Sequence, residues 1–171
     1  YSPMAELPNM SYVDAGTLEL IRSCGVDPVS SADLYQYVCA RWTSEQLRLH
    51  RVAAVKLGVI LDRVFAYLPT HIGKVTEYDI RHFIREEFVR EKVEAPDGPV
   101  VAVNAHASDP HFEPTAEHSA VIEEGDLLLI DLWACEPGGV YADATWVAHV
   151  GRKVPEEQEK VFAVVKGARD Q

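Results

Sequence analysis

The chain has 171 residues, of which 47% are hydrophobic, and its formal net charge is −11. This length is enough for one full domain, or for one domain plus a piece of another. An acidic surface repels phosphate backbones and anionic membranes, so neither nucleic acid nor a membrane is an expected partner. No apolar run approaches the roughly 18 residues that a membrane-spanning helix needs.

The cysteines also narrow the class of protein. Cys24, Cys39 and Cys135 are few, odd in number and widely spaced. They form neither a CxxC zinc motif nor a dense disulfide framework. Reduced thiols in a cytoplasmic protein are therefore expected.

The first 40 residues contain short elements only. Leu7-Pro8-Asn9 is typical of a turn. Residues 17–24 predict a short helix, with Gly25 as its C-cap. A second short helix is expected from Ser30 through Val38. This is too little material for an independent core.

Two longer helices and then strands follow. Thr43-Ser44-Glu45-Gln46 matches a capping box, and apolar residues recur at three and four up to Leu68, before Pro69. Thr76 to Asp79 opens a second helix that fades by Lys92. Further on, the pattern predicts a strand at 100–103, a polar loop at 104–115, an apolar strand at 127–134, a turn at 136–139, a returning strand at 140–150 and a helix from Pro155. This order indicates an α+β fold.

Asp131 interrupts the apolar strand, which should be buried. A buried carboxylate costs several kcal/mol unless it is paired, hydrogen-bonded or bound to metal. Asp143 is the only charged residue between Val140 and Trp146. The midpoint of the two aspartates falls on Pro137, so a symmetric hairpin would place them directly opposite each other, with Cβ atoms roughly 4.5–5.5 Å apart.

Two carboxylates at such a short distance repel each other, so they require a proton or a cation between them. Pairs of divalent ions about 3.5–4 Å apart, held by oxygen ligands, are common in hydrolases. The alternative is that Asp143 is an exposed strand-end residue and Asp131 caps a backbone group. A bulge or an asymmetric turn would break the direct pairing.

Three histidines, His106, His111 and His118, precede the apolar strand that contains Asp131. His111 lies between two prolines that stiffen the backbone and would hold the imidazole in a fixed pose. Beside a metal it could donate a hydrogen bond to an oxyanion. The alternative is that all three are ordinary surface or core residues.

The stretch from Asn104 to Gly151, NAHASDPHFEPTAEHSAVIEEGDLLLIDLWACEPGGVYADATWVAHVG, resembles the pita-bread metallopeptidases: creatinase, aminopeptidase P and prolidase. Gly125-Asp126, Asp131 and Ala142-Asp143-Ala144-Thr145 match the family's motifs in order, and His111 corresponds to its substrate-side histidine. Gly73 to Glu77 resembles the family's G-x-T-E helix start. The resemblance implies an antiparallel sheet with helices on one face. It also implies that residues 1–40 are the tail of an amino-terminal domain and that 41–171 form the first half of the catalytic domain.

This sequence departs from the family pattern at several points. Trp133 replaces the usual Gly after the first Asp, and Trp146 replaces the usual Arg after the Thr, which suggests a distinct substrate pocket with Trp133 as a substrate-binding residue. The separation of the aspartates is one residue longer than usual. The family's remaining ligands, one His and two Glu, have no counterpart here, so the isolated chain is expected to bind metal weakly and to be inactive.

The resemblance further implies hydrolysis of Xaa-Pro peptide bonds by a water activated between two divalent ions, Mn²⁺ first, with Zn²⁺ or Co²⁺ as alternatives. Asp131 would chelate one ion or bridge the two ions, and Asp143 would bridge them. His111 would stabilise the oxyanion or the proline-side group of the peptide substrate. A creatinase-like C–N hydrolase and a non-catalytic peptide-binding module remain alternatives. A homodimer is left open.

Overall fold

The computed structural model describes residues 1–3, 7 and 11–171, which form two compact units, residues 1–45 and 46–171. The turn predicted at residues 7–9 lies, except for Leu7, outside the described residues. The assignment of residues 1–40 to the tail of an amino-terminal domain stays a prediction.

The first unit contains two short helices, α1 (Ala15–Ser23) and α2 (Ala32–Cys39), close to the predicted positions. Asp14 caps α1 by accepting a hydrogen bond of 3.0 Å from the Thr17 amide. No residue of α1 is buried, and α2 buries only Ala32. These helices therefore contribute little core, as their composition predicts.

The second unit begins with the two long helices that the apolar periodicity predicts, α3 (Ser44–Tyr67) and α4 (Glu77–Glu91). Pro69 lies in the 3₁₀ turn η3 (Leu68–Thr70), which follows α3. A capping box opens α4, since the Thr76 hydroxyl accepts from the Asp79 amide while the Asp79 carboxylate accepts from the Thr76 amide.

The sheet has three antiparallel strands in the order β1-β2-β3. Strands β1 (Val100–Val103) and β2 (Leu127–Ala134) have the predicted bounds, and β3 (Ala142–His149) is slightly shorter than predicted. The short helix η4 (Asn104–Ser108) follows β1, and α5 (Glu156–Arg169) follows β3.

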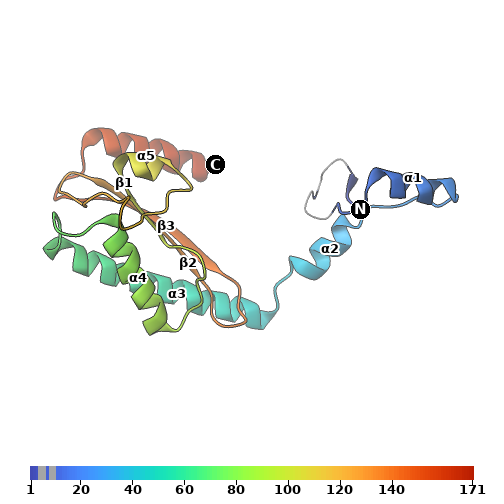
Figure 1. The fold of residues 1–171 in the computed structure, drawn as a ribbon, viewed down its shortest axis with the longest axis horizontal. Helices are drawn as coiled ribbons and strands as arrows, with labels where there is room; N and C mark the ends of the chain where they lie inside the picture. The colour runs from blue at the N-terminus through green and yellow to red at the C-terminus, as the bar shows by residue number, and fades with distance from the viewer. Residues whose placement is uncertain (4–6, 8–10) are drawn as a thin grey trace. The chain divides into compact units, whose positions relative to one another are not determined.

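Burial alternates along β2 and defines two different faces. Leu128, Ile130, Leu132 and Ala134 are buried in the core with α3 and α4, whereas the alternate residues are only half-buried. Figure 1 shows α3 and α4 on one side of the strands and α5 on the other. The core cluster joins these elements through Ile60, Val64, Ile80, Ile84 and Phe88, among others, and each such side chain stabilises the fold by about 1.5–3 kcal/mol.

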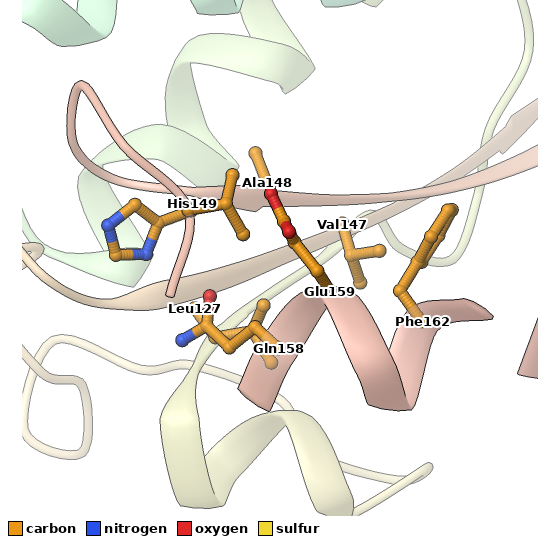
Figure 2. Close-up of a pocket in the computed structure, with 8 residues that line it drawn as sticks. Leu127, Val147, Ala148, His149, Gln158, Glu159 and Phe162 are labelled. Atoms are coloured by element: carbon orange, nitrogen blue, oxygen red, sulfur yellow. The ribbon is translucent and has the colours of Figure 1, made fainter. Parts of the chain in front are cut away.

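On its other face the sheet meets α5 at the end that carries Leu127 and His149. Figure 2 shows Val147 of β3 facing Phe162 of α5 across a pocket of about 230 Å³ that Leu127 and His149 also line. No described residue of α5 is buried, and Phe162 is 53% exposed. In the described part of the chain, no helix is both long and apolar enough to cross a membrane.

Candidate functional site

The two predicted metal-binding aspartates share the half-buried face of the sheet, but they are not directly opposite each other. Asp131 pairs with Thr145, and Asp143 pairs with Trp133. Asp131 and Asp143 are therefore diagonal neighbours on one face, and the prediction of direct opposition was wrong by two residues of register. The structure retains what the electrostatic argument needs, because both side chains lie on the same side of the hairpin.

The displaced register comes from the turn. The observed pairs are symmetric about Gly138, which has a φ of +71° that favours glycine, rather than about Pro137. A one-residue shift of the turn centre moves the register by two residues. It therefore preserves the face of each side chain.

The expectation that Asp131 is buried was also wrong, since it is only half-buried. Its Oδ1 accepts a hydrogen bond of 2.6 Å from the Thr145 hydroxyl. Asp131 and Thr145 line a pocket of about 250 Å³ together with Leu129 and the loop 107–110. The strand residues thus form one wall of a small pocket, and the loop forms another.

Asp143 has a perturbed carboxyl group. Its side chain is exposed, yet neighbouring residues partly shield the carboxyl from water, and this desolvation raises its pKa above the ordinary value. The negative charge of Asp131 raises the pKa further, while a hydrogen bond from the Ala144 amide lowers it. The two aspartates therefore lie close enough to repel each other.

Trp133 is half-buried on the same face, next to Asp143 across the hairpin. Its indole ring packs on Gly98, where an added Cβ would come within 2.5 Å of two ring atoms. Gly98 also has a φ of +66°, so both its backbone and its contact with the ring exclude a larger residue. Trp133 thus presents an aromatic ring, packed on Gly98, on the face that carries Asp143.

His111 lies directly after Pro110, a residue that lines the Asp131 pocket. Its side chain is exposed, and its amide donates a hydrogen bond of 2.9 Å to the Asp109 carboxylate. The structure therefore places His111 at the edge of the pocket rather than in its lining.

The sequence did not predict a buried polar cluster that contacts this loop. Glu77 is 0% exposed and accepts hydrogen bonds from the ring of His106 and from the amides of Val103 and Ala120. The G-x-T-E pattern marked Glu77 as a helix start, but nothing local in the sequence indicates its partners.

Asp131 and Asp143 fit a divalent cation. They supply hard oxygen atoms on one face, and a cation would relieve the repulsion that raises the pKa of Asp143. In residues 1–3, 7 and 11–171, no three His, Cys, Asp or Glu side chains converge as a metal site.

The model of metallopeptidase family M24 matches residues 49–171. The chain belongs to metallopeptidase family M24. The match covers α4, the sheet, the histidine-bearing loop and α5, and hence Asp131, Asp143, Trp133 and His111. No curated protein matched the chain by sequence.

Solved structures with the same fold include two prolidases and an X-Pro aminopeptidase. The prolidase from Pyrococcus horikoshii OT3 has a TM-score of 0.70 at 18% identity, covering 94% of this chain and 45% of that one. The X-Pro aminopeptidase from Thermotoga maritima MSB8 has a TM-score of 0.69 at 19% identity, covering 92% and 44%. The prolidase from Thermococcus sibiricus has a TM-score of 0.68 at 21% identity, covering 94% and 42%.

These matches confirm the predicted α+β fold as part of a pita-bread domain. At these identities they show the fold alone. The chain spans less than half the length of these three structures.

Proposed function

We propose that this chain is part of a metal-dependent peptidase that hydrolyses Xaa-Pro bonds. The observation that carries the proposal is the placement of Asp131 and Asp143 on one open sheet face, beside the loop that bears His111. Membership of M24 supports a peptidase. The prolidase and X-Pro aminopeptidase folds favour proline next to the cleaved bond.

In this proposal Asp131 and Asp143 hold two divalent ions, with Mn²⁺ as the first candidate and Zn²⁺ or Co²⁺ as alternatives. Bound ions of this kind polarise a carbonyl and lower the pKa of a bound water. The Thr145 hydroxyl holds Oδ1 of Asp131, so the orientation of that carboxylate is fixed before any ligand arrives. Ligands for the remaining coordination positions come from outside the described residues.

The substrate side of the proposed site is formed by Trp133 and His111. The Trp133 indole offers a flat apolar surface next to Asp143, which suits a proline ring. His111, at the edge of the pocket, donates a hydrogen bond to the oxyanion or binds the proline-side group of the peptide.

Two carboxylates alone leave most coordination positions of two ions to water. We therefore propose that the isolated chain binds Mn²⁺ weakly and does not turn over peptides. The three cysteines carry free thiols, which supports a cytoplasmic location as part of the same proposal.

The decisive experiment measures hydrolysis of Xaa-Pro peptides, and of the same peptides with alanine in place of proline, by the longer protein to which we assign this chain. Asp143→Asn should lower kcat/KM at least about 1,000-fold with Mn²⁺ present, since it removes one ligand carboxylate. Asp62→Asn, an exposed aspartate of α3, is the matched control and should leave activity unchanged.

Unchanged activity in Asp143→Asn would refute the metal role. Equal cleavage of the proline and alanine peptides would refute the specificity. Isothermal titration of the isolated chain with Mn²⁺ that gives two tight sites would contradict its proposed weak binding.

A further inference from the structure

Glu77 is a fully buried acidic residue at the start of α4, and its side chain contacts the histidine-bearing loop. Its Oε1 accepts hydrogen bonds from the Val103 amide at 2.7 Å and from Nδ1 of His106 at 2.9 Å. Its Oε2 accepts from the Ala120 amide at 2.7 Å and lies 3.0 Å from the same ring nitrogen. With the Glu77 carboxyl ionised, both of its oxygens accept, so the proton shared with His106 lies on Nδ1.

These donors lie at both ends of one loop. Val103 is the last residue of β1, His106 lies in η4 at the start of the loop, and Ala120 lies at its end. The Glu77 amide also donates a hydrogen bond of 3.0 Å to the Ala120 carbonyl, so backbone and side chain of Glu77 hold the same residue. One carboxylate thus closes the loop 104–120 at both ends.

His106 also contacts Phe112, which directly follows His111 in the chain. The His106 ring stacks on Phe112 with ring centroids 4.2 Å apart, and Phe112 is 6% exposed. The stretch 107–110, between His106 and His111, lines the pocket of Asp131. Fixing His106 therefore fixes the segment that carries His111 on both of its sides.

Helix capping alone does not account for Glu77. An acidic residue in the first turn of α4 interacts favourably with the helix dipole. However, Thr76 and Asp79 already cap this helix, and the described partners of the Glu77 side chain all belong to β1 and the loop. A buried carboxylate is tolerated here because charge-assisted hydrogen bonds replace its hydration.

We propose that Glu77 is a positioning residue, which acts through His106 to hold the His111 loop against Asp131 and Thr145. Its effect on the loop stands on the geometry alone. Its effect on catalysis rests on the proposed function.

The test compares matched variants of the protein by NMR and amide hydrogen exchange. Glu77→Gln removes one of the two accepting oxygens, and His106→Phe keeps the ring stack but removes the donor. Glu87→Gln is the control for the first variant, because Glu87 is similarly buried in α4 but pairs with Arg63 and Arg90. His118→Phe is the control for the second, because His118 approaches Phe112 without a hydrogen bond between its ring and Glu77.

We expect His106→Phe to speed amide exchange in residues 104–112 about tenfold or more, while exchange in β2 stays unchanged, as loss of a charge-assisted hydrogen bond predicts. In Glu77→Gln the side-chain NH₂ replaces one accepting oxygen and must face the Val103 or the Ala120 amide, so exchange of one of these two amides should also speed. Neither control should have either effect. Equal loop exchange in His106→Phe and His118→Phe, or exchange of Val103 and Ala120 in Glu77→Gln equal to that in Glu87→Gln, would overturn the proposal.

In the longer peptidase, His106→Phe should lower kcat about tenfold with KM nearly unchanged, since the loop positions a group that acts on the transition state. An unchanged kcat would overturn the catalytic part. If the wild-type protein cleaves no Xaa-Pro peptide, the proposed function fails, and the exchange results still decide the role of Glu77 in the loop.

Discussion

Replacing Asp143 by Asn should stabilise the metal-free protein. A substitution in a functional site usually does not raise the free energy of unfolding. Asp143→Asn should do so because it removes one of two like charges on one sheet face. Stability gained by losing a carboxylate would show that the wild-type pair is strained without a cation. The prediction therefore tests the electrostatic basis of the proposed site without any activity assay.

The size of the gain follows from the register. Diagonal cross-strand neighbours lie roughly 7–8 Å apart. Two unit charges at about 7 Å repel by about 0.6 kcal/mol in bulk water and about 2.4 kcal/mol at an effective dielectric constant of 20. Because the Asp143 side chain is exposed, solvent screening places the expected gain near the lower end, at about 0.5–1 kcal/mol at pH 7.

The pH dependence has a definite sign. The pKa of Asp143 in the folded state is raised above the ordinary 3.8, so the folded state binds this proton more tightly than the unfolded chain does. The stabilisation from the bound proton is complete below pH 3.8 and is lost as the pH rises through the raised pKa. The advantage of Asp143→Asn should therefore be largest above that pKa and should shrink as the pH falls towards 3.8.

Urea unfolding at pH 7 and pH 4, in low salt and in 1 M NaCl, measures this gain. Asp62→Asn controls for the general benefit of removing one charge from a chain with a net charge of −11. The Asp143 effect should exceed the control at pH 7 in low salt and approach it at high salt, where screening is nearly complete. Addition of Mn²⁺ should stabilise the wild type and not Asp143→Asn. A variant less stable than wild type at pH 7, or a gain equal to that of Asp62→Asn, would refute the reasoning.

Three further substitutions test the rest of the site and the core. Gly98→Ala should destabilise the fold by about 1–3 kcal/mol and shift tryptophan fluorescence, because the added Cβ would lie 2.5 Å from the Trp133 ring. The control is Gly58→Ala in α3, where an added Cβ meets no atom within 4 Å, and it should be neutral or stabilising. Equal effects of the two substitutions on stability would contradict the contact between Gly98 and Trp133. Thr145→Val should weaken Mn²⁺ binding about tenfold, measured by water-proton relaxation, because Asp131 loses its hydrogen bond, and unchanged binding would remove Thr145 from the site. Ile130→Ala should lower the free energy of unfolding by about 2–5 kcal/mol, since this side chain is 1% exposed, and a loss below about 1 kcal/mol in urea unfolding would contradict its core position.

The helices and strands were predictable because each carries its own periodic signal. The apolar spacing of α3 and the continuous run of β2 placed both within one residue. The register between β2 and β3 was not predictable, because it depends on which residue of a long turn takes the left-handed conformation. The turn at 136–139 contains two glycines, Gly138 and Gly139, and the backbone shows that the strands pair symmetrically about Gly138.

The partners of Glu77 were out of reach for a different reason. They lie 26 to 43 residues further along the chain, and an acidic residue at a helix start is ordinary. The sequence placed His106 and Glu77 in separate patterns, one in a loop and one at a helix start. Only the packing of the loop onto α4 joins them.

The two-residue shift in register gives the aspartates different neighbours, and this difference favours different roles. Asp131 lies opposite Thr145, whose hydroxyl occupies Oδ1 and leaves Oδ2 as the freer oxygen for a cation. Asp143 lies opposite Trp133, which offers no hydrogen bond from a hydroxyl, and partial desolvation together with the Asp131 charge raises its pKa. A cation that approached this face would therefore meet one carboxylate already oriented by a hydrogen bond and a second carboxylate whose proton is held more tightly. Direct opposition would have given the two aspartates each other as cross-strand partners, without the Thr145 hydrogen bond that now distinguishes them.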